Sequence, residues 1–125
     1  MERHPSISES EWQVMKTIWA GPPKTLQDIL SQLAHTGWST TTIQTYLARL
    51  VKKKVLRTER QGKGYLYYPA VTEKECQLAE GKDFLGRIYD GSLARMVSGF
   101  VKSGSLTEDE LQELKTLLEQ SEKEM

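Results

Sequence analysis

The apolar positions in the first half of the chain recur with the spacing of α-helices in three successive segments. Ser8 and Thr25 each begin a capping-box pattern, and residues 21–23 and 35–37 contain the glycine and proline breakers that end helices. These signals predict three helices, the last of which ends near Lys53. The apolar faces are Trp12, Met15, Ile18 and Trp19 in the first segment, Leu26, Ile29, Leu30 and Leu33 in the second, and Ile43, Leu47 and Leu50 in the third.

The period of the apolar residues changes after the third helix. Residues 55–60 and 65–69 are short β-prone runs, and the four residues 61–64 between them include two glycines. Two such runs around a short glycine-containing loop predict a β-hairpin. Pro69 fits this assignment because it closes the second strand, where an edge donor can be spared. Three helices followed by a hairpin are typical of a winged helix-turn-helix domain, so we expect a mainly α fold with a small β-hairpin.

The third predicted helix has an unusual polar face. Solvated helix faces usually carry Glu and Lys, which favour helix formation and solubility. Here the first two turns present small, uncharged hydrogen-bonding side chains, and positive charge comes only in the later turns. The face is formed by Thr41, Thr45, Ala48 and Lys52, with Gln44 and Arg49 at its edges.

This face suits contact with DNA bases, because the third helix of a winged helix-turn-helix enters the major groove. Threonine hydroxyls can bond to base edges and their methyls can pack on thymine, while Gln44 can pair with adenine and Arg49 with guanine or phosphate. For Ser39 and Thr40 the alternative is helix capping, since hydroxyls also bind free N–H groups. The predicted DNA contacts are Ser39, Thr40, Thr41, Thr42, Gln44, Thr45, Arg49, Lys52, Arg60 and Lys63.

Basic residues at the end of the third helix and in the hairpin are assigned to the phosphate backbone. The lysines at 52–54 lie where the helix would leave the groove, so phosphate neutralisation is their expected role. Arg60 and Lys63 flank a glycine-rich loop that would reach along the phosphates, and a solvated turn is the alternative. The tyrosines at 65, 67 and 68 are interpreted as strand packing rather than as stacking platforms.

The second half of the chain has helical periodicity throughout. Thr72 and Thr107 begin capping-box patterns, and residues 90–91 and 103–105 contain glycine breaks between three helices. Such helices cannot bury their apolar stripes deeply on one another, so we expect them to pack against a second copy of the chain. The predicted dimerisation residues are Phe84, Ile88, Leu93, Met96, Val97, Phe100, Val101, Leu111, Leu114, Leu117 and Leu118.

Charge divides the chain at nearly the same place. The 17 basic and 17 acidic residues balance overall. Residues 1–70, however, hold ten Lys and Arg against five Asp and Glu, whereas residues 71–125 hold seven against twelve. A basic half joined to an acidic half favours one part that faces a polyanion, although chance clustering is the alternative. We therefore predict a DNA-binding domain over 1–70 and a helical dimerisation domain over 71–125.

Other classes of function lack their sequence signatures. No apolar run has membrane-spanning length and no leader is recognisable, so we expect a soluble, cytoplasmic protein without membrane insertion. Cys76 alone excludes an internal disulfide and a thiolate metal site, and we expect it to be a small buried hydrophobe. His4 and His35 are isolated, and no phosphate-binding glycine loop or nucleophile elbow is present. We predict no enzyme activity, no cofactor and no metal.

Several stretches resemble the penicillinase-repressor family, which includes repressors of β-lactamase and methicillin-resistance operons and copper-responsive relatives. ISESEWQVMKTIW is similar to the family's opening helix, WSTTTIQTYLARLVKK to its recognition helix, and GYLYYP to its wing strand. The similarity continues through FLGRIYDGSLARMVSGFV into the family's dimerisation region. The resemblance implies a homodimer with N-terminal winged helices on a palindromic operator and intertwined C-terminal helices.

The resemblance also implies a means of release from DNA. In antibiotic-responsive members a membrane sensor protease triggers cleavage within the dimerisation helices, and the corresponding bond here joins Gly99 to Phe100. Members cleaved there usually have Asn where this chain has Gly99. Copper-responsive relatives end in Cys-x-Cys motifs, which the ending LLEQSEKEM lacks, so copper sensing is disfavoured. Lys54 stands where the family tends to place glycine, and a left-handed backbone there would cost about 1 kcal/mol.

The sequence thus predicts a dimeric, sequence-specific repressor that occupies a palindromic operator, of the antibiotic-resistance type by resemblance. Two alternatives stay open. The winged helix could be a protein-interaction adaptor that never binds DNA specifically, with the apolar stripe over 111–118 paired to a different protein. The acidic half could instead bind a small ligand, although no residue pattern marks such a pocket.

Overall fold

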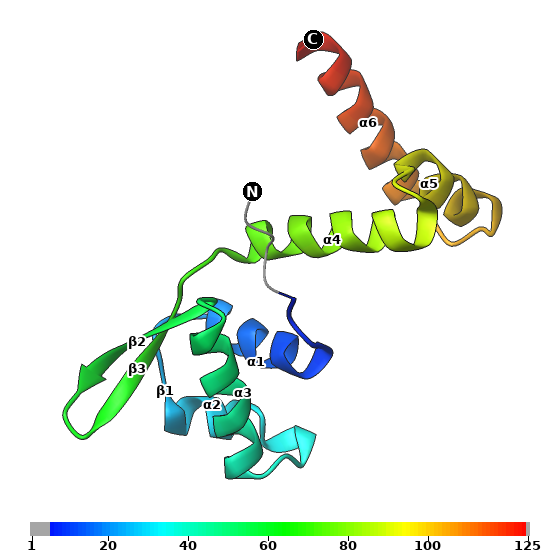
Figure 1. Ribbon diagram of the computed structural model, residues 1–125. Helices are drawn as coiled ribbons and strands as arrows, with labels where there is room; N and C mark the ends of the chain where they lie inside the picture. The colour runs from blue at the N-terminus through cyan, green and yellow to red at the C-terminus, as the bar shows by residue number, and fades with distance from the viewer. Residues whose placement is uncertain (1–5, 125) are drawn as a thin grey trace. The chain divides into compact units, whose positions relative to one another are not determined.

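The computed structural model describes residues 6–124 of the chain (Figure 1). Contacts divide it into two compact units that meet within one helix, between Glu80 and Gly81. Ten elements follow one another along the described residues. They are α1 (Glu9–Trp19), β1 (Lys24–Thr25), α2 (Leu26–Gln32), the 3-10 helix η1 (Ala34–Thr36), α3 (Thr40–Lys52), β2 (Leu56–Gln61), β3 (Gly64–Pro69), α4 (Glu73–Tyr89), α5 (Leu93–Lys102) and α6 (Glu108–Glu124).

The first unit has the three helices and the hairpin that the sequence predicts, so the winged-helix fold is confirmed. Its core lies between the apolar faces of the helices and the base of the hairpin. Val14 is fully buried although the sequence pattern did not include it, while Trp12 and Trp19 lie at the rim and pack edge to face. The buried apolar residues are Ile7, Val14, Met15, Ile18, Ile29, Leu33, Ile43, Leu47, Leu50, Val55, Leu56 and Cys76.

The sheet has three strands rather than the two of a simple hairpin. β1 pairs antiparallel with β3, with Lys24 opposite Tyr67 and Thr25 opposite Leu66, so β3 is the central strand. β1 is only two residues long, which is too short to show an alternating pattern in the sequence. The extra strand ties the start of α2 to the hairpin.

The wing loop is also tighter than predicted. Gln61 and Gly64 pair with each other across the strands, so the loop consists of Gly62 and Lys63 alone. Gly62 has φ 58°, which only glycine adopts without strain, and glycine at the first loop position suits a two-residue hairpin turn. Lys63 therefore lies at the tip of the wing.

The end of α3 is closed by a Schellman motif that contains a lysine instead of glycine. The N–H of Val55 donates to the carbonyl oxygen of Leu50, and the N–H of Lys54 donates to that of Val51, both at 3.0 Å. Lys54 has φ 65°, so the residue that replaces the family's glycine does adopt a left-handed backbone. The motif fixes where the chain turns from the helix into the wing.

The first unit continues into α4. The indole N–H of Trp19 donates to the carbonyl oxygen of Val71 at 3.0 Å, and Cys76 on α4 is fully buried in the core. The expectation that Cys76 is a buried hydrophobe is confirmed, and burial raises the pKa of its thiol. With these contacts the first compact unit extends to Glu80, while the division into a DNA-binding domain over 1–70 and a dimerisation domain over 71–125 stays a prediction.

The second unit consists of the end of α4 with α5 and α6, and its helix signals act as predicted. Thr107 and Glu110 form a reciprocal capping box with hydrogen bonds of 3.1 and 3.2 Å. From Gly81 to Glu124 no side chain of the described chain is buried. No helix within residues 6–124 is long and apolar enough to cross a membrane.

Seven of the predicted dimerisation residues are between 41% and 66% exposed: Phe84, Ile88, Leu93, Phe100, Val101, Leu117 and Leu118. The other four, Met96, Val97, Leu111 and Leu114, are half-buried.

Candidate DNA-binding surface

The start of α3 is organised by its own hydroxyl groups. Ser39 is the N-cap: its Oγ accepts a hydrogen bond from the N–H of Thr42 at 3.1 Å and donates to Thr42 Oγ1 at 3.0 Å. This bonding supports the capping alternative for Ser39 and extends it to Thr42. Thr40 is the first helical residue and is exposed, so it remains a predicted DNA contact.

One side of α3 is buried and the opposite side is open. Ile43, Leu47 and Leu50 pack into the core, which anchors the helix on the rest of the first unit. Thr45 Oγ1 donates to the carbonyl oxygen of Thr41 at 3.0 Å, which leaves the Thr45 methyl group and an oxygen lone pair for an outside partner. The exposed residues of the open side are Thr41, Gln44, Thr45, Ala48, Arg49 and Lys52.

Four basic side chains remain available around this face. Arg49 and Lys52 are exposed on α3, and Arg60 and Lys63 are exposed on the wing. Within residues 6–124 none of the four takes part in an ion pair. Figure 1 shows the β2–β3 hairpin reaching outward from the helices, so its tip extends the surface beyond α3. Such an arrangement can place cations on the phosphates beside a helix in the groove.

Two other basic residues of the first unit are already engaged. The ammonium of Lys53 lies 2.6 Å from Glu11 Oε1, so it pairs with a carboxylate of its own chain, and its contact with a phosphate stays a prediction. Arg57 on the outer side of β2 pairs with Glu59 at 2.8 Å and lies 4.2 Å from the ring centre of Tyr68. The hydrogen bond from Arg57 also holds the pKa of the Glu59 carboxyl below its ordinary value.

The tyrosines of β3 do not all have the packing role that the sequence suggested. Tyr67 packs against the core, and burial raises its pKa. Tyr68 lies under Arg57. Tyr65 is 49% exposed, so the packing prediction is wrong for this residue. It lies near the wing tip, opposite Arg60.

Sequence reasoning missed a hollow between the start of α2 and the wing tip. Its polar lining includes Gln27 from α2 and Gln61 and Lys63 from the wing. Nothing in the local pattern marks Gln27 or Gln61, because their proximity comes from the pairing of β1 with β3. We add both residues to the candidate surface as groups able to donate hydrogen bonds to phosphate.

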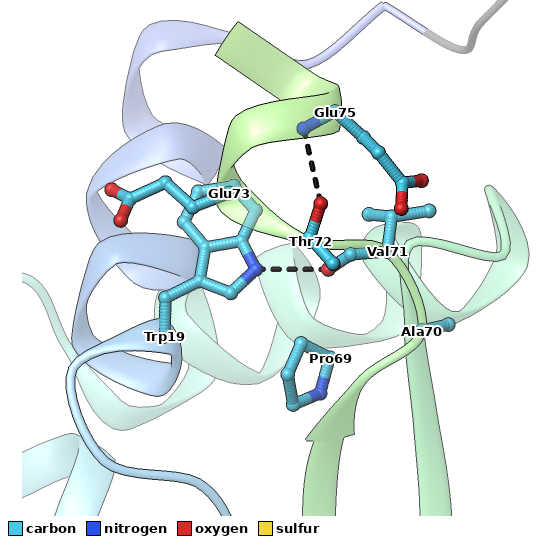
Figure 2. A pocket seen from close by; sticks show the side chains of 7 residues that line it. All are labelled: Trp19, Pro69, Ala70, Val71, Thr72, Glu73 and Glu75. Carbon is cyan, nitrogen blue, oxygen red and sulfur yellow. Dashed lines mark hydrogen bonds between the residues drawn. The ribbon is translucent and has the colours of Figure 1, made fainter.

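A second hollow in the first unit has a different character (Figure 2). Figure 2 shows the Trp19 ring beside the connection from β3 to α4, where the N–H of Glu75 donates to Thr72 Oγ1 at 3.1 Å. Its lining has two carboxylates and no basic side chain, so it does not suit a polyanion. The lining residues are Trp19, Pro69, Ala70, Val71, Thr72, Glu73 and Glu75.

The remaining residues singled out in the sequence lie away from this surface or outside the description. His35 is exposed in η1, and His4 lies outside the described residues. Gly99 and Phe100 are exposed in the last turn of α5, in the second unit.

Comparison with known proteins matches this chain over most of its length. Residues 7–120 match the family described as penicillinase repressor. The chain is 36% identical over 121 residues to the penicillinase repressor of Bacillus licheniformis, covering 96% of this chain and 94% of that protein. It is 32% identical over 113 residues to the methicillin resistance regulatory protein MecI of Staphylococcus aureus (strain N315), covering 90% and 92%. It also resembles the solution structure of monomeric Bacillus licheniformis BlaI in complex with the blaP half-operator. There the TM-score is 0.52 and the identity 37%, over 60% of this chain and 93% of that one.

Proposed function

The chain belongs to the penicillinase repressor family, whose members are transcriptional repressors and not enzymes, and on that premise we propose that it is a dimeric, sequence-specific repressor. The observation that carries the proposal is the open face of α3, with small hydrogen-bonding side chains and unpaired cations, on a core-anchored helix. The complex of a relative with its half-operator supports the same use of this fold.

In this proposal α3 enters the major groove and the wing follows the phosphates. Thr41, Gln44 and Thr45 contact base edges, because they lie in the first turns of the helix, whose N-terminal part reaches deepest. Arg49 and Lys52 lie in the later turns, where Lys52 meets the phosphate backbone. Lys63 at the wing tip contacts phosphate or the neighbouring groove.

Two copies act together on a palindromic operator. A single module of this kind covers about 600–1,000 Å² of DNA-facing surface, which is too little for tight binding alone. Linking two modules turns the second contact into an intramolecular one and raises occupancy. The apolar stripes of α4, α5 and α6 are the surface on which a second copy packs, because seven of their large apolar side chains are between 41% and 66% exposed.

Release from DNA follows from loss of this dimer. The names of the relatives connect them to penicillinase and methicillin resistance, so we propose an operator of the antibiotic-resistance type, in the bacterial cytoplasm. By the same analogy a membrane sensor protease system would promote cleavage between Gly99 and Phe100. Both residues are exposed, and a glycine inside a helix lowers its stability by about 0.5–1 kcal/mol, which favours the local opening that proteolysis requires.

Selection from a random pool of duplex DNA tests the proposal. The full chain is incubated with the pool at about 150 mM salt, where nonspecific electrostatic binding is weakened. We expect enrichment of a two-fold symmetric sequence, with Gln44→Ala recovering a more relaxed motif than the wild type. Absence of any enriched sequence, with binding that fades smoothly as salt rises, would contradict specific recognition and favour the adaptor alternative.

A further inference from the structure

Lys53 differs from its neighbours in the run of lysines that ends α3. Its Nζ donates to Glu11 Oε1 at 2.6 Å and to the carbonyl oxygen of Ser6 at 2.8 Å. The Glu11 side chain is only 1% exposed and that of Lys53 is 32% exposed, whereas Lys52 and Lys54 are exposed. The ammonium of Lys53 thus belongs to the packed structure of the first unit, because it bonds a buried carboxylate.

We infer that Lys53 is a positioning residue for DNA recognition: held by Glu11, it fixes the end of α3 on α1 and does not itself bind phosphate. The inference rests on the proposed function of α3 as the recognition helix.

The ion pair connects two segments that are distant in sequence, because Glu11 and Lys53 are 42 positions apart. Glu11 lies in the first turn of α1, and its Oε1 also accepts the N–H of Ser8 at 2.9 Å. Lys53 is the C-cap of α3 and is followed by the Schellman turn at Lys54. A single carboxylate oxygen therefore joins the start of α1 to the end of α3.

Apolar contacts between the two helices cannot supply the same accuracy. Burial of the α1 and α3 faces is favourable but non-directional. It therefore opposes separation of the two helices strongly, but opposes small rotations or slides of one helix on the other only weakly. A charge-assisted hydrogen bond has a short optimum distance and a preferred direction. Recognition side chains must be held within about 0.5 Å of their productive position, which is a scale that such a bond can set.

The charge of Lys53 is also unavailable to DNA. If the ammonium turned outward to a phosphate, Glu11 would be left ionised and buried without its cation, which is strongly unfavourable. Glu11 Oε2 already lacks a hydrogen-bond partner among the described residues, so loss of Lys53 would leave the carboxylate with fewer bonds still. Lys53 should therefore add nothing to the salt dependence of binding, unlike an exposed neighbour such as Lys52.

The test compares three full-length variants with the wild type: Lys53→Met, Lys53→Arg and, as the matched control, Lys52→Met. Affinity is measured for the selected operator and for a scrambled duplex over a range of salt concentrations, well below the melting temperature of each variant. For Lys53→Met we expect the operator affinity to fall about tenfold, which equals the cost of losing roughly one base contact. The affinity for the scrambled duplex and the salt slope should not change. For Lys52→Met we expect both affinities to fall and the slope to decrease by about one.

Lys53→Arg should keep the operator preference, because a guanidinium can bond both oxygens of Glu11, including the unpartnered Oε2. Glu11→Gln provides a second approach should Lys53→Met fail to fold. It retains an oxygen that can accept the N–H of Ser8, and it leaves every basic residue in place. We expect it to lower the ratio of operator to scrambled affinity.

Two results would overturn the inference while leaving the proposed function intact. One is a decrease of about one in the salt slope of Lys53→Met, which would make Lys53 a phosphate contact. The other is an unchanged ratio of operator to scrambled affinity in folded Lys53→Met and Glu11→Gln, even if their melting temperatures fall. A wild-type protein without any preference would instead remove the proposed function, and the inference with it.

Discussion

Replacing Phe100 by alanine should dissociate the proposed dimer while leaving the first unit folded. Phe100 lies on α5 in the same apolar stripe as Leu93, Met96 and Val97, and none of these residues belongs to the core of the first unit. In the single chain Phe100 is 44% exposed, so much of its ring is free to be covered by a second copy.

The size of the effect follows from that exposed fraction. A phenylalanine presents about 200 Å², so 44% corresponds to roughly 90 Å² that a partner can cover. At about 25 cal/mol per Å² this area contributes about 2 kcal/mol in each protomer. A two-fold interface uses the residue twice, so truncation in both copies removes about 4 kcal/mol and raises the dimer Kd about a thousandfold.

Sedimentation equilibrium over a wide range of protein concentration measures this Kd directly. Lys102→Ala is the matched control, because Lys102 is exposed on α5 but lies outside the apolar stripe. It should leave the Kd unchanged, and circular dichroism should show similar helix content in both variants. An alanine variant at Phe100 that dimerises within about threefold of the wild type would refute the reasoning, and so would equal dissociation of the Lys102 control.

Three further predictions concern the first unit. Lys63→Ala should weaken binding to all duplexes alike and lower the salt slope by about one, whereas Thr41→Ala should relax sequence preference at constant slope; competition titrations showing the reverse would exchange these roles. Lys54→Gly should unfold in urea with about 1 kcal/mol more stability than Lys54→Ala, because φ is 65° there, and equal stabilities would exclude strain. Burial alone would raise the pKa of Glu11, but hydrogen bonds from Lys53 and Ser8 outweigh it and hold the pKa below its ordinary 4.5. This stabilisation is therefore complete above pH 4.5 and is lost as the pH falls through the lower folded pKa. In Glu11→Gln the free energy of unfolding should fall less steeply with decreasing pH than in the wild type. An equally steep fall would contradict the assignment.

Local signals in the sequence were enough to predict most of the secondary structure. The capping boxes at Ser8 and Thr25 involve residues three positions apart, and glycines mark the breaks, so each signal acts within one turn of chain. The end of α3 near Lys53 was predicted as well, and the left-handed residue Lys54 follows directly after it. The polar face of α3 was also predictable, since a helix has only one buried side.

The tertiary structure decided which of those side chains remain available. Lys53 looks like its neighbours in the sequence, but the fold brings Glu11 to it from α1. Tyr65 has the same strand pattern as Tyr67 but is 49% exposed near the wing tip, opposite Arg60. For the same reason the roles of Gln27 and Gln61 depend on a strand pairing that no local pattern contains.

What the sequence by itself determined is therefore the six α-helices and the two strands of the hairpin, their caps and breaks, and the family to which the chain belongs. What only the tertiary structure decided is the third strand, the extension of the core into α4, and the division of the lysines between interior and surface. The physical reason is that capping and periodicity depend on neighbours a few residues away. Burial and ion pairing depend instead on partners that only the folded chain brings together.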